Sequence, residues 1–148
     1  MLVVRRLEVP EYLLVQRVRY RADDSTLAEW PNTYWAEQIE TGIAREFNNA
    51  LRRHLPGWQL CEANCGERSP AVSLQVRLTR MDYLRSQQRL EAGVRLSLWN
   101  TARPPRLLHA EEHSYSIDGD ADKPQSHART LSAFLDCAAG DAALAVLH

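Results

Sequence analysis

The sequence has little cysteine, no excess of charge of either sign and no long apolar run, and each shortage excludes a class of protein. Its 148 residues carry 18 basic and 19 acidic side chains, which gives a net charge of −1. A nucleic-acid-binding domain would show a strong basic excess. No apolar run approaches the roughly 20 residues that a membrane-spanning helix needs. The composition is ordinary for a globular protein that binds no nucleic acid.

Cysteine is both scarce and odd in number, with Cys61, Cys65 and Cys137 as the three residues. Such a set cannot form a disulfide framework. Two alternatives stay open: a disulfide between Cys61 and Cys65 in an oxidising compartment, or three free thiols. Cys137 lies among alanines of a predicted helix, a position that favours a small, buried and inert thiol.

The motifs of common enzymes are also missing. There is no Gly-x-Ser-x-Gly motif, phosphate-binding loop or dinucleotide fingerprint. His109, Glu111 and His113 share one face of a predicted strand, as metal ligands can, but their spacing does not match the helical zinc motif. A solvated strand face is favoured, and Glu112 points to the opposite face. The sequence predicts no catalytic residue, metal or cofactor; an enzyme using this trio or Cys61 is the least favoured alternative.

Length and hydrophobic patterning predict one α/β domain over residues 1–148. Strands are expected at 2–9, 15–21, 26–28, 72–78, 90–98 and 107–117, with a further candidate at 58–61. The strands from residue 72 onward form an antiparallel meander. The predicted fold is a mixed sheet with a largely antiparallel C-terminal part, packed by two long amphipathic helices.

The first helix is expected to follow Pro31, with Asn32 or Thr33 as its cap, and to end before Pro56. The last helix follows Asp122, and Gly140 marks either a weak point or an early end. Both carry an apolar stripe with steps of three and four residues. The stripe residues are Ala36, Ile39, Ile43, Phe47, Ala50, Leu51 and Leu55 in the first helix, and Ala128, Leu131, Leu135, Ala138, Ala142 and Ala145 in the last.

The N-terminal region raises two questions about contacts with a partner. Pro10 cannot donate to a strand ladder, so the chain there lies at a sheet edge or leaves the sheet. The three arginines of the next strand share one face, which is either a charged edge that prevents strand addition or a contact for an acidic partner or lipid head group. Trp30 and Trp35 bracket the helix start, as core residues or as an exposed aromatic anchor. The arginines are Arg17, Arg19 and Arg21.

Several motifs resemble one known family. The stretch VPEYL at Val9–Leu13 precedes the arginine-rich VRYR, then WAEQI near a helix start and LRRHLPG at the helix end. Trp99 on a central strand and an alanine- and leucine-rich last helix complete the pattern. Together they resemble the ABC-type transport auxiliary lipoproteins (PqiC/YmbA-like), along nearly the whole chain.

The resemblance implies a non-enzymatic periplasmic lipoprotein of a Gram-negative cell envelope, anchored in the outer membrane by an N-terminal lipid whose cysteine is not in this chain. It implies work beside an MCE-family substrate-binding protein, a permease and an ATPase that move lipids, and assembly as a homo-oligomer. The family motif marks the positions Pro10, Glu11, Tyr12 and Leu13. Nothing in MLVVRR at the start has the order of a signal peptide, so Met1 is either native or follows a removed leader.

The leading hypothesis is therefore an interaction module that docks the MCE-family partner. Its predicted contact residues are the four motif positions together with the three arginines and the two tryptophans, Trp30 and Trp35. The alternative is a domain that itself binds phospholipid in a groove between a helix and the sheet.

Overall fold

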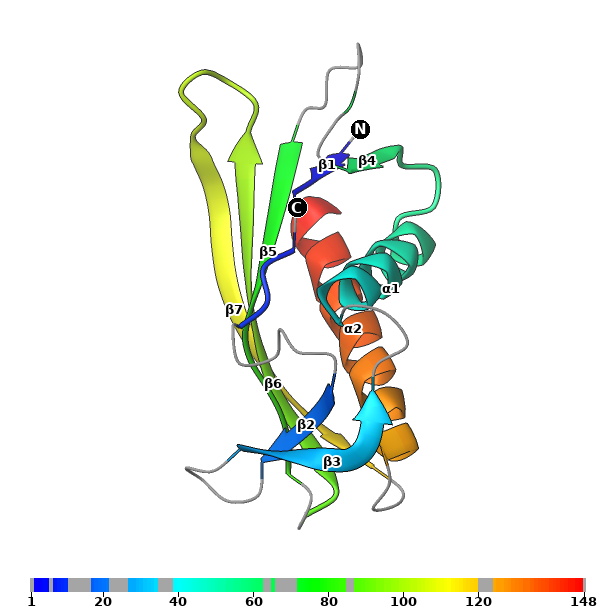
Figure 1. The fold of residues 1–148 in the computed structure, drawn as a ribbon. Helices are drawn as coiled ribbons and strands as arrows, with labels where there is room; N and C mark the ends of the chain where they lie inside the picture. The colour runs from blue at the N-terminus through cyan, green and yellow to red at the C-terminus, as the bar shows by residue number, and fades with distance from the viewer. Residues whose placement is uncertain are drawn as a thin grey trace.

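The structure is a computed structural model that describes residues 2–5, 7–10, 17–21, 27–34, 39–62, 65, 72–84, 87–119 and 124–147. It has two layers, with a twisted sheet on one side and two helices side by side on the other (Figure 1). The elements are β1 (Leu2–Val4), β2 (Arg17–Arg21), β3 (Leu27–Tyr34), α1 (Ile39–His54), β4 (Leu60–Glu62), β5 (Val72–Leu84), β6 (Arg89–Asn100), β7 (Leu107–Asp118) and α2 (Pro124–Leu147). The predicted α/β class, with its mixed sheet and two amphipathic helices, is confirmed.

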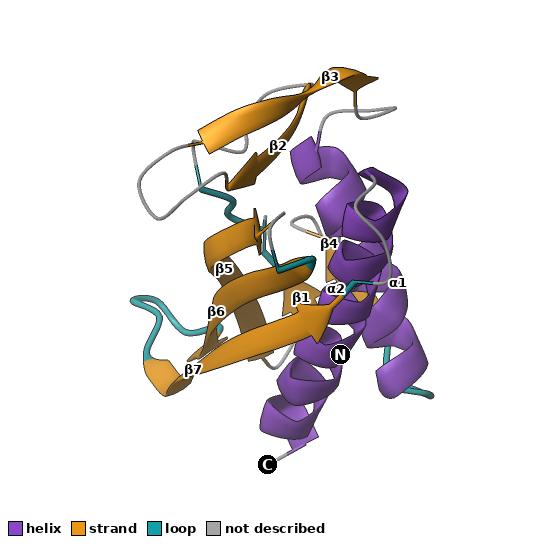
Figure 2. Cartoon of the chain, turned by 90° about the horizontal axis from the view of Figure 1, so that it is seen from below, coloured by secondary structure: helices purple, strands orange, loops and turns teal. Residues whose placement is uncertain are grey.

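The sheet is organised around β5, the longest strand. One side of β5 pairs with β6, and β6 with β7, both antiparallel, so the predicted meander is confirmed. The other side of β5 is shared by two short parallel neighbours. β1 pairs with its beginning, at Leu2 opposite Val72, and β2 meets its end, at Arg21 opposite Leu84. β4 lies outside β1, and β3 lies outside β2, so the hairpin of β2 and β3 occupies one end of the sheet (Figure 2).

The core lies between the sheet and the helices. The alternating residues of β5 and β6 and the apolar stripes of both helices converge there, as the sequence patterns predict. Each large aliphatic or aromatic side chain that is fully buried contributes about 1.5–3 kcal/mol. The largest fully buried side chains are Tyr83, Phe47, Phe134, Leu2, Ile43, Leu51, Leu55, Leu74, Met81, Leu90, Leu96 and Leu135.

The start of the first helix was predicted wrongly. Asn32 and Thr33 belong to β3, which also contains Pro31, and the described helix α1 is Ile39–His54. Pro31 is compatible with this strand because β3 pairs only with β2 within the described residues, and a proline on an edge strand removes no ladder bond on its open side. The tryptophan Trp30 therefore lies on the edge strand and does not bracket a helix start.

The last helix also differs from two expectations. It continues through Gly140 to Leu147, so Gly140 is not an early end. Its segment Gln125–Leu147 is long and apolar enough to cross a membrane by length and composition, although no uninterrupted apolar run was found. In the fold α2 packs on β6, β7 and α1, and its buried residues are part of the core. The helix is therefore the central core helix of a globular domain.

Cys137 contradicts the expectation of a buried thiol, because it is an exposed free cysteine on α2. The alanines that suggested burial lie on the other side of the helix, where Ala138, Ala139 and Ala142 are fully buried. Helical rotation separates these faces, since neighbouring residues point about 100° apart.

Candidate interaction surfaces

The N-terminal segment before Pro10 continues along β5 after β1 has ended. The amide of Arg5 donates to the carbonyl of Leu74, and Glu8 exchanges backbone hydrogen bonds with Val76 and Leu78, at 2.9–3.0 Å. Pro10 has no amide hydrogen and follows the last of these bonds, as expected for a residue at which the chain leaves the sheet. The other family-marked positions, Glu11, Tyr12 and Leu13, lie outside the described residues, as does Trp35.

Pro10 borders an open cavity of about 880 Å³ beside β5. Both positively and negatively charged side chains line this cavity. A row of paired residues crosses the sheet from Arg77 to Arg95 to Glu112, and Arg77 Nε lies 3.5 Å from Glu8 Oε2. The complete lining is Arg5, Leu7, Glu8, Val9, Pro10, Glu40, Gln75, Arg77, Leu78, Thr79, Arg95 and Glu112.

The predicted arginine strand is not the edge of the sheet. Arg17, Arg19 and Arg21 lie on β2, which has β3 on one side and the end of β5 on the other. Arg19 is paired in register with Glu29 of β3. The outermost strand at this end of the sheet is β3, which carries Trp30, and β2 meets β5 at Arg21 alone, so only at Arg21 does the arginine strand have a partner on both sides.

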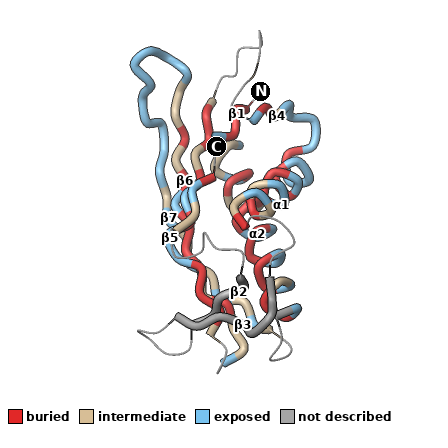
Figure 3. The backbone as a smooth tube through the Cα atoms, viewed as in Figure 1, coloured by how far each residue is buried: buried red, intermediate tan, exposed pale blue. Residues whose placement is uncertain are grey.

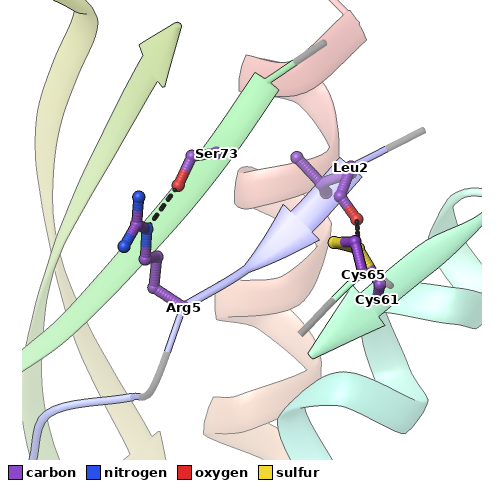
Figure 4. The surroundings of a disulfide bond; sticks show 5 residues. All are labelled: Leu2, Arg5, Cys61, Cys65 and Ser73. Atoms are coloured by element: carbon purple, nitrogen blue, oxygen red, sulfur yellow. Dashed lines mark hydrogen bonds between the residues drawn. A yellow bond between two sulfur atoms is a disulfide. The ribbon is translucent and has the colours of Figure 1, made fainter. Parts of the chain in front are cut away.

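The structure joins Cys61 and Cys65 in a disulfide next to the N-terminal strand (Figure 4). Cys61 is the buried central residue of β4, and its Sγ lies 3.8 Å from the carbonyl oxygen of Leu2. A disulfide sulfur carries no hydrogen, so this approach is a packing contact and not a hydrogen bond. The bond fastens the chain that follows β4 to the strand that pairs with β1.

A second hollow, which we call the α2–β7 groove, opens between the C-terminal half of α2 and the first half of β7. It encloses about 510 Å³. Leu144 and Leu108 line it and are 57% and 53% exposed, and the beginning of β7 is exposed throughout (Figure 3). The complete lining is Val72, Leu98, Leu108, His109, Glu111, His113, Asp141, Leu144, Ala145 and Val146.

The polar wall of the α2–β7 groove is a connected cluster of two histidines and two carboxylates. Glu111 lies between His109 and His113, with Oε2 3.3 Å from Nε2 of His109 and Oε1 3.4 Å from Nε2 of His113. Nδ1 of His113 lies 3.7 Å from Oδ2 of Asp141 on α2. The hydroxyl of Tyr115 donates a hydrogen bond to the same oxygen of Asp141. The cluster thus joins the strand to the helix across the groove.

The ionisation of this cluster follows from these contacts. Burial acts to raise the pKa of the Glu111 carboxyl, but the bonds from His109 and His113 outweigh it and hold that pKa below its usual value. Burial, followed by the bond to Asp141, raises the pKa of the Tyr115 phenol above its usual range. Glu111 is therefore negatively charged and Tyr115 is neutral at physiological pH.

The trio that resembled metal ligands does share one face, as the strand pattern predicts. Its two histidines, however, contact the carboxylate of Glu111 itself. Within the ranges that the structure describes, no group of three or more histidine, cysteine, aspartate or glutamate side chains is arranged to hold a metal ion. Glu112 lies on the opposite face, where it lines the cavity beside Pro10.

Sequence reasoning missed the α2–β7 groove because no single motif marks it. Two weak signals were present. The leucines Leu144 and Leu147 fall outside the buried stripe of the last helix, and both are exposed. The strand that carries His109, Glu111 and His113 is polar where its neighbour β6 is apolar, and the pairing places these three opposite Leu98, Leu96 and Val94.

Comparison with known proteins identifies one family. The family model described as ABC-type transport auxiliary lipoprotein component matches residues 1–143. No curated protein matches the chain in sequence.

Solved structures share the fold at low sequence identity. The chain is similar to an uncharacterised protein, with a TM-score of 0.85 and 18% identity over 98% of this chain and 91% of that one. It is similar to a Xanthomonas campestris protein, with a TM-score of 0.75 and 12% identity over 96% and 80%. It is also similar to the PelC dodecamer of Paraburkholderia phytofirmans, with a TM-score of 0.55 and 9% identity over 95% and 81%.

Proposed function

This chain belongs to the family of ABC-type transport auxiliary lipoprotein components, and from that premise we propose that it is a non-enzymatic part of an MCE-type lipid-transport system. In this role it docks the MCE-family substrate-binding protein in the periplasm, between the inner and outer membranes. A lipid anchor in the outer membrane holds the full-length protein at that place. The match to the family model over residues 1–143 is the observation that carries the proposal.

Two features of the structure support this role. The disulfide between Cys61 and Cys65 suits an oxidising compartment such as the periplasm, because cytosolic thiols are kept reduced. The molecule also exposes four large leucines, at Leu107, Leu108, Leu144 and Leu147. Large exposed patches of apolar side chains commonly mark the surfaces at which a protein binds a partner.

Capture of the MCE-family protein of the same system by the purified full-length chain tests the proposal. We expect a complex that survives gel filtration and that contains both proteins. The proposal would be contradicted if the chain formed no complex with the MCE-family protein at any salt concentration. A complex with the permease alone or with the ATPase alone would contradict it as well.

The predicted contact residues, which include the motif position Tyr12 and the strand residue Arg19, give a first prediction for the contact. Tyr12→Ala and Arg19→Glu are expected to weaken capture of the partner, because a large aromatic and an arginine are typical of interface hot spots. Circular dichroism of both variants controls for folding. Undiminished capture by well-folded variants would remove Arg19, Tyr12 and the residues next to Tyr12 (Pro10, Glu11 and Leu13) from the interface.

We further propose that the chain assembles as a homo-oligomer. The PelC structure with the related fold is a dodecamer, which supports assembly of subunits of this shape. Mass photometry of the purified protein measures the subunit number directly. A monomer at micromolar concentration would contradict this part of the proposal.

A second candidate function is direct lipid binding, and the cavity beside Pro10 favours it. Its volume of about 880 Å³ lies within the range of ligand sites. Arg5, Arg77 and Arg95 line it, and guanidinium groups bind the phosphate of a phospholipid head group well. Native mass spectrometry after purification tests this function. Consistent detection of the chain without lipid counts against it.

A further inference from the structure

The outer edge of β7 is open for pairing. Among the described strands, β7 pairs with β6 alone, so one side of its 12 residues has no strand partner. Natural edge strands are commonly protected by proline, lysine or a bulge that turns the edge away. The strand Leu107–Asp118 has no proline, lysine or arginine, and its one register shift against β6 lies at Leu108, so the pairing is regular from His109 to Asp118. Its backbone amides and carbonyls can therefore accept a further strand.

The face of β7 beside this edge carries acidic side chains. Glu111 and Asp141 bring two carboxylates to the α2–β7 groove, where the imidazole of His113 contacts both of them. None of the side chains that line the groove is a lysine or an arginine. A positively charged side chain entering the groove would meet two carboxylate acceptors in a partly dehydrated site, where opposite charges attract more strongly than in water.

Apolar surface flanks these charges on both sides. Leu108 lies at the beginning of β7, and Leu144 lies on the exposed side of α2, and both line the groove. The two are 53% and 57% exposed. An occupant that covers them must itself carry apolar side chains on either side of its positive charge.

We propose that the α2–β7 groove binds an extended segment of a partner protein that adds a strand to the open edge of β7 and places a lysine or arginine between apolar side chains. The inference rests on the docking role proposed above and names the site and the occupant. In such a complex, main-chain hydrogen bonds to β7 supply affinity, while alternate side chains enter the groove and supply specificity. The basic side chain lies against the carboxylates of Glu111 and Asp141, beside the imidazole of His113 that contacts both, and its apolar neighbours cover Leu108 and Leu144.

The charge of the groove argues against a phospholipid as its occupant. A phosphate head group is anionic, and like charges placed together in an interface cost several kcal/mol. The two carboxylates also interrupt the apolar wall that an acyl chain would need. A protein segment with one basic residue satisfies both the charge and the apolar flanks.

Binding of two synthetic peptides tests the inference on the full chain. Both have the length of β7 and alternate valine with threonine, and they differ only in a central arginine or a central glutamate. Chemical-shift mapping of the backbone amides locates the bound peptide. We expect the arginine peptide to shift and protect the amides of β7 and to bind about tenfold tighter than the glutamate peptide.

Matched variants separate the groove from the rest of the strand. Glu111→Lys reverses the charge inside the groove, whereas Glu112→Lys makes the same change on the opposite face of the same strand. We expect about a tenfold loss of affinity for the arginine peptide with Glu111→Lys and no loss with Glu112→Lys. Leu144→Glu is expected to weaken binding, while Ala133→Glu, on an exposed position of α2 outside the groove, is not.

Three results would overturn the inference: equal affinity for the two peptides, shifts that map away from β7, or no binding of either peptide. Stronger perturbation of β7 by anionic phospholipid vesicles than by the arginine peptide would assign the groove to lipid. Pairing of β7 with a second copy of the chain would assign the edge to self-assembly.

Capture of the MCE-family protein is measured on the same variants. Undiminished capture by Glu111→Lys would reject the groove as the binding site but leave the docking role standing. Binding of the arginine peptide by a chain that captures no MCE-family protein would reject the docking role but leave the groove as a peptide-binding site.

Discussion

The imidazole of His127 stacks on the phenol ring of Tyr83, with the ring centroids 4.8 Å apart and the ring planes at 30°. His127 lies in the first turn of α2, and Tyr83 lies near the end of β5. Both side chains are almost completely buried, so the contact fastens the start of the helix to the sheet. Burial lowers the pKa of His127 to about 4, although a backbone hydrogen bond acts in the opposite direction.

The buried His127 predicts that the protein is less stable in mild acid. In the folded chain the imidazole stays neutral down to about pH 4, whereas in the unfolded chain it takes up a proton near pH 6.5. Between these values the unfolded state binds more protons, so the free energy of unfolding falls as the pH is lowered. The stability is fully present above pH 6.5, and roughly 3 kcal/mol is lost by pH 4. Urea unfolding at several pH values measures this loss.

The variant His127→Phe keeps an aromatic ring against Tyr83 but does not titrate. We expect its pH dependence between pH 6.5 and 4 to be flatter than that of the unmodified chain. Identical slopes for the variant and the unmodified chain would show that His127 does not control acid stability.

Loss of the disulfide between Cys61 and Cys65 is expected to destabilise the fold. The two cysteines are four positions apart, and closing so short a loop in the unfolded chain is worth about 2 kcal/mol in the chain-entropy model. The double variant Cys61→Ser/Cys65→Ser should lose about this amount of unfolding free energy, measured by denaturant unfolding. Cys137→Ser is the control, because this exposed thiol has no disulfide partner. Equal stability of the unmodified chain with and without reductant would contradict the prediction.

Gly119 is predicted to tolerate no side chain. A Cβ at this position would lie 2.6 Å from Oγ of Ser126, 2.8 Å from the Tyr83 hydroxyl and 2.9 Å from the carbonyl oxygen of Gln88. The last of these is backbone that already accepts a hydrogen bond from the Gly119 amide, so it cannot move away cheaply. We expect Gly119→Ala to cost about 1–3 kcal/mol of unfolding free energy, as overpacking does.

Gly140→Ala is the matched control for the same substitution. There the nearest atom to a new Cβ is a ring carbon of His54 at 3.4 Å, which is ordinary contact. Alanine in a helix interior is favoured over glycine by about 1 kcal/mol, so this variant should be as stable as the unmodified chain or more stable. Thermal unfolding compares the two variants, and a destabilised Gly140→Ala together with an unaffected Gly119→Ala would contradict the packing described.

Tyr115→Phe is expected to cost about 1 kcal/mol, because it removes a hydrogen bond to a carboxylate at a half-buried site. The ring itself remains packed beside Phe134, at 5.3 Å between centroids. A double-mutant cycle with Asp141→Asn isolates the energy of this pair. Strict additivity in the cycle would show that the two side chains do not interact.

The raised pKa of the Tyr115 phenol gives a separate prediction for alkaline pH. The stability that comes from the neutral phenol is fully present below about pH 10 and is lost as the pH rises beyond it. The free energy of unfolding of Tyr115→Phe should therefore be less sensitive to alkali than that of the unmodified chain.

Local pattern was sufficient for most of the fold. The alternation in β5, β6 and β7 and the stripe of Ile39, Ile43 and Phe47 indicate which faces are buried, because side-chain direction repeats with a fixed period in each kind of element. The predicted start of α1 was wrong for a related reason. Pro31 and Asn32 are good residues before a helix and also acceptable ones in an edge strand, and only the pairing of β3 with β2 decides between the two.

The sequence by itself determined the family, the class of fold, the two apolar helix faces and the opposite orientation of Glu111 and Glu112. Only the tertiary structure decided that Cys61 pairs with Cys65, that Cys137 is exposed, and that Asp141 of α2 meets His113 and Tyr115 of β7. The contacts of Asp141 join positions 26 or more residues apart, and the exposure of Cys137 depends on which face of α2 meets the sheet. They depend on how the helices are placed on the sheet, which no local periodicity specifies.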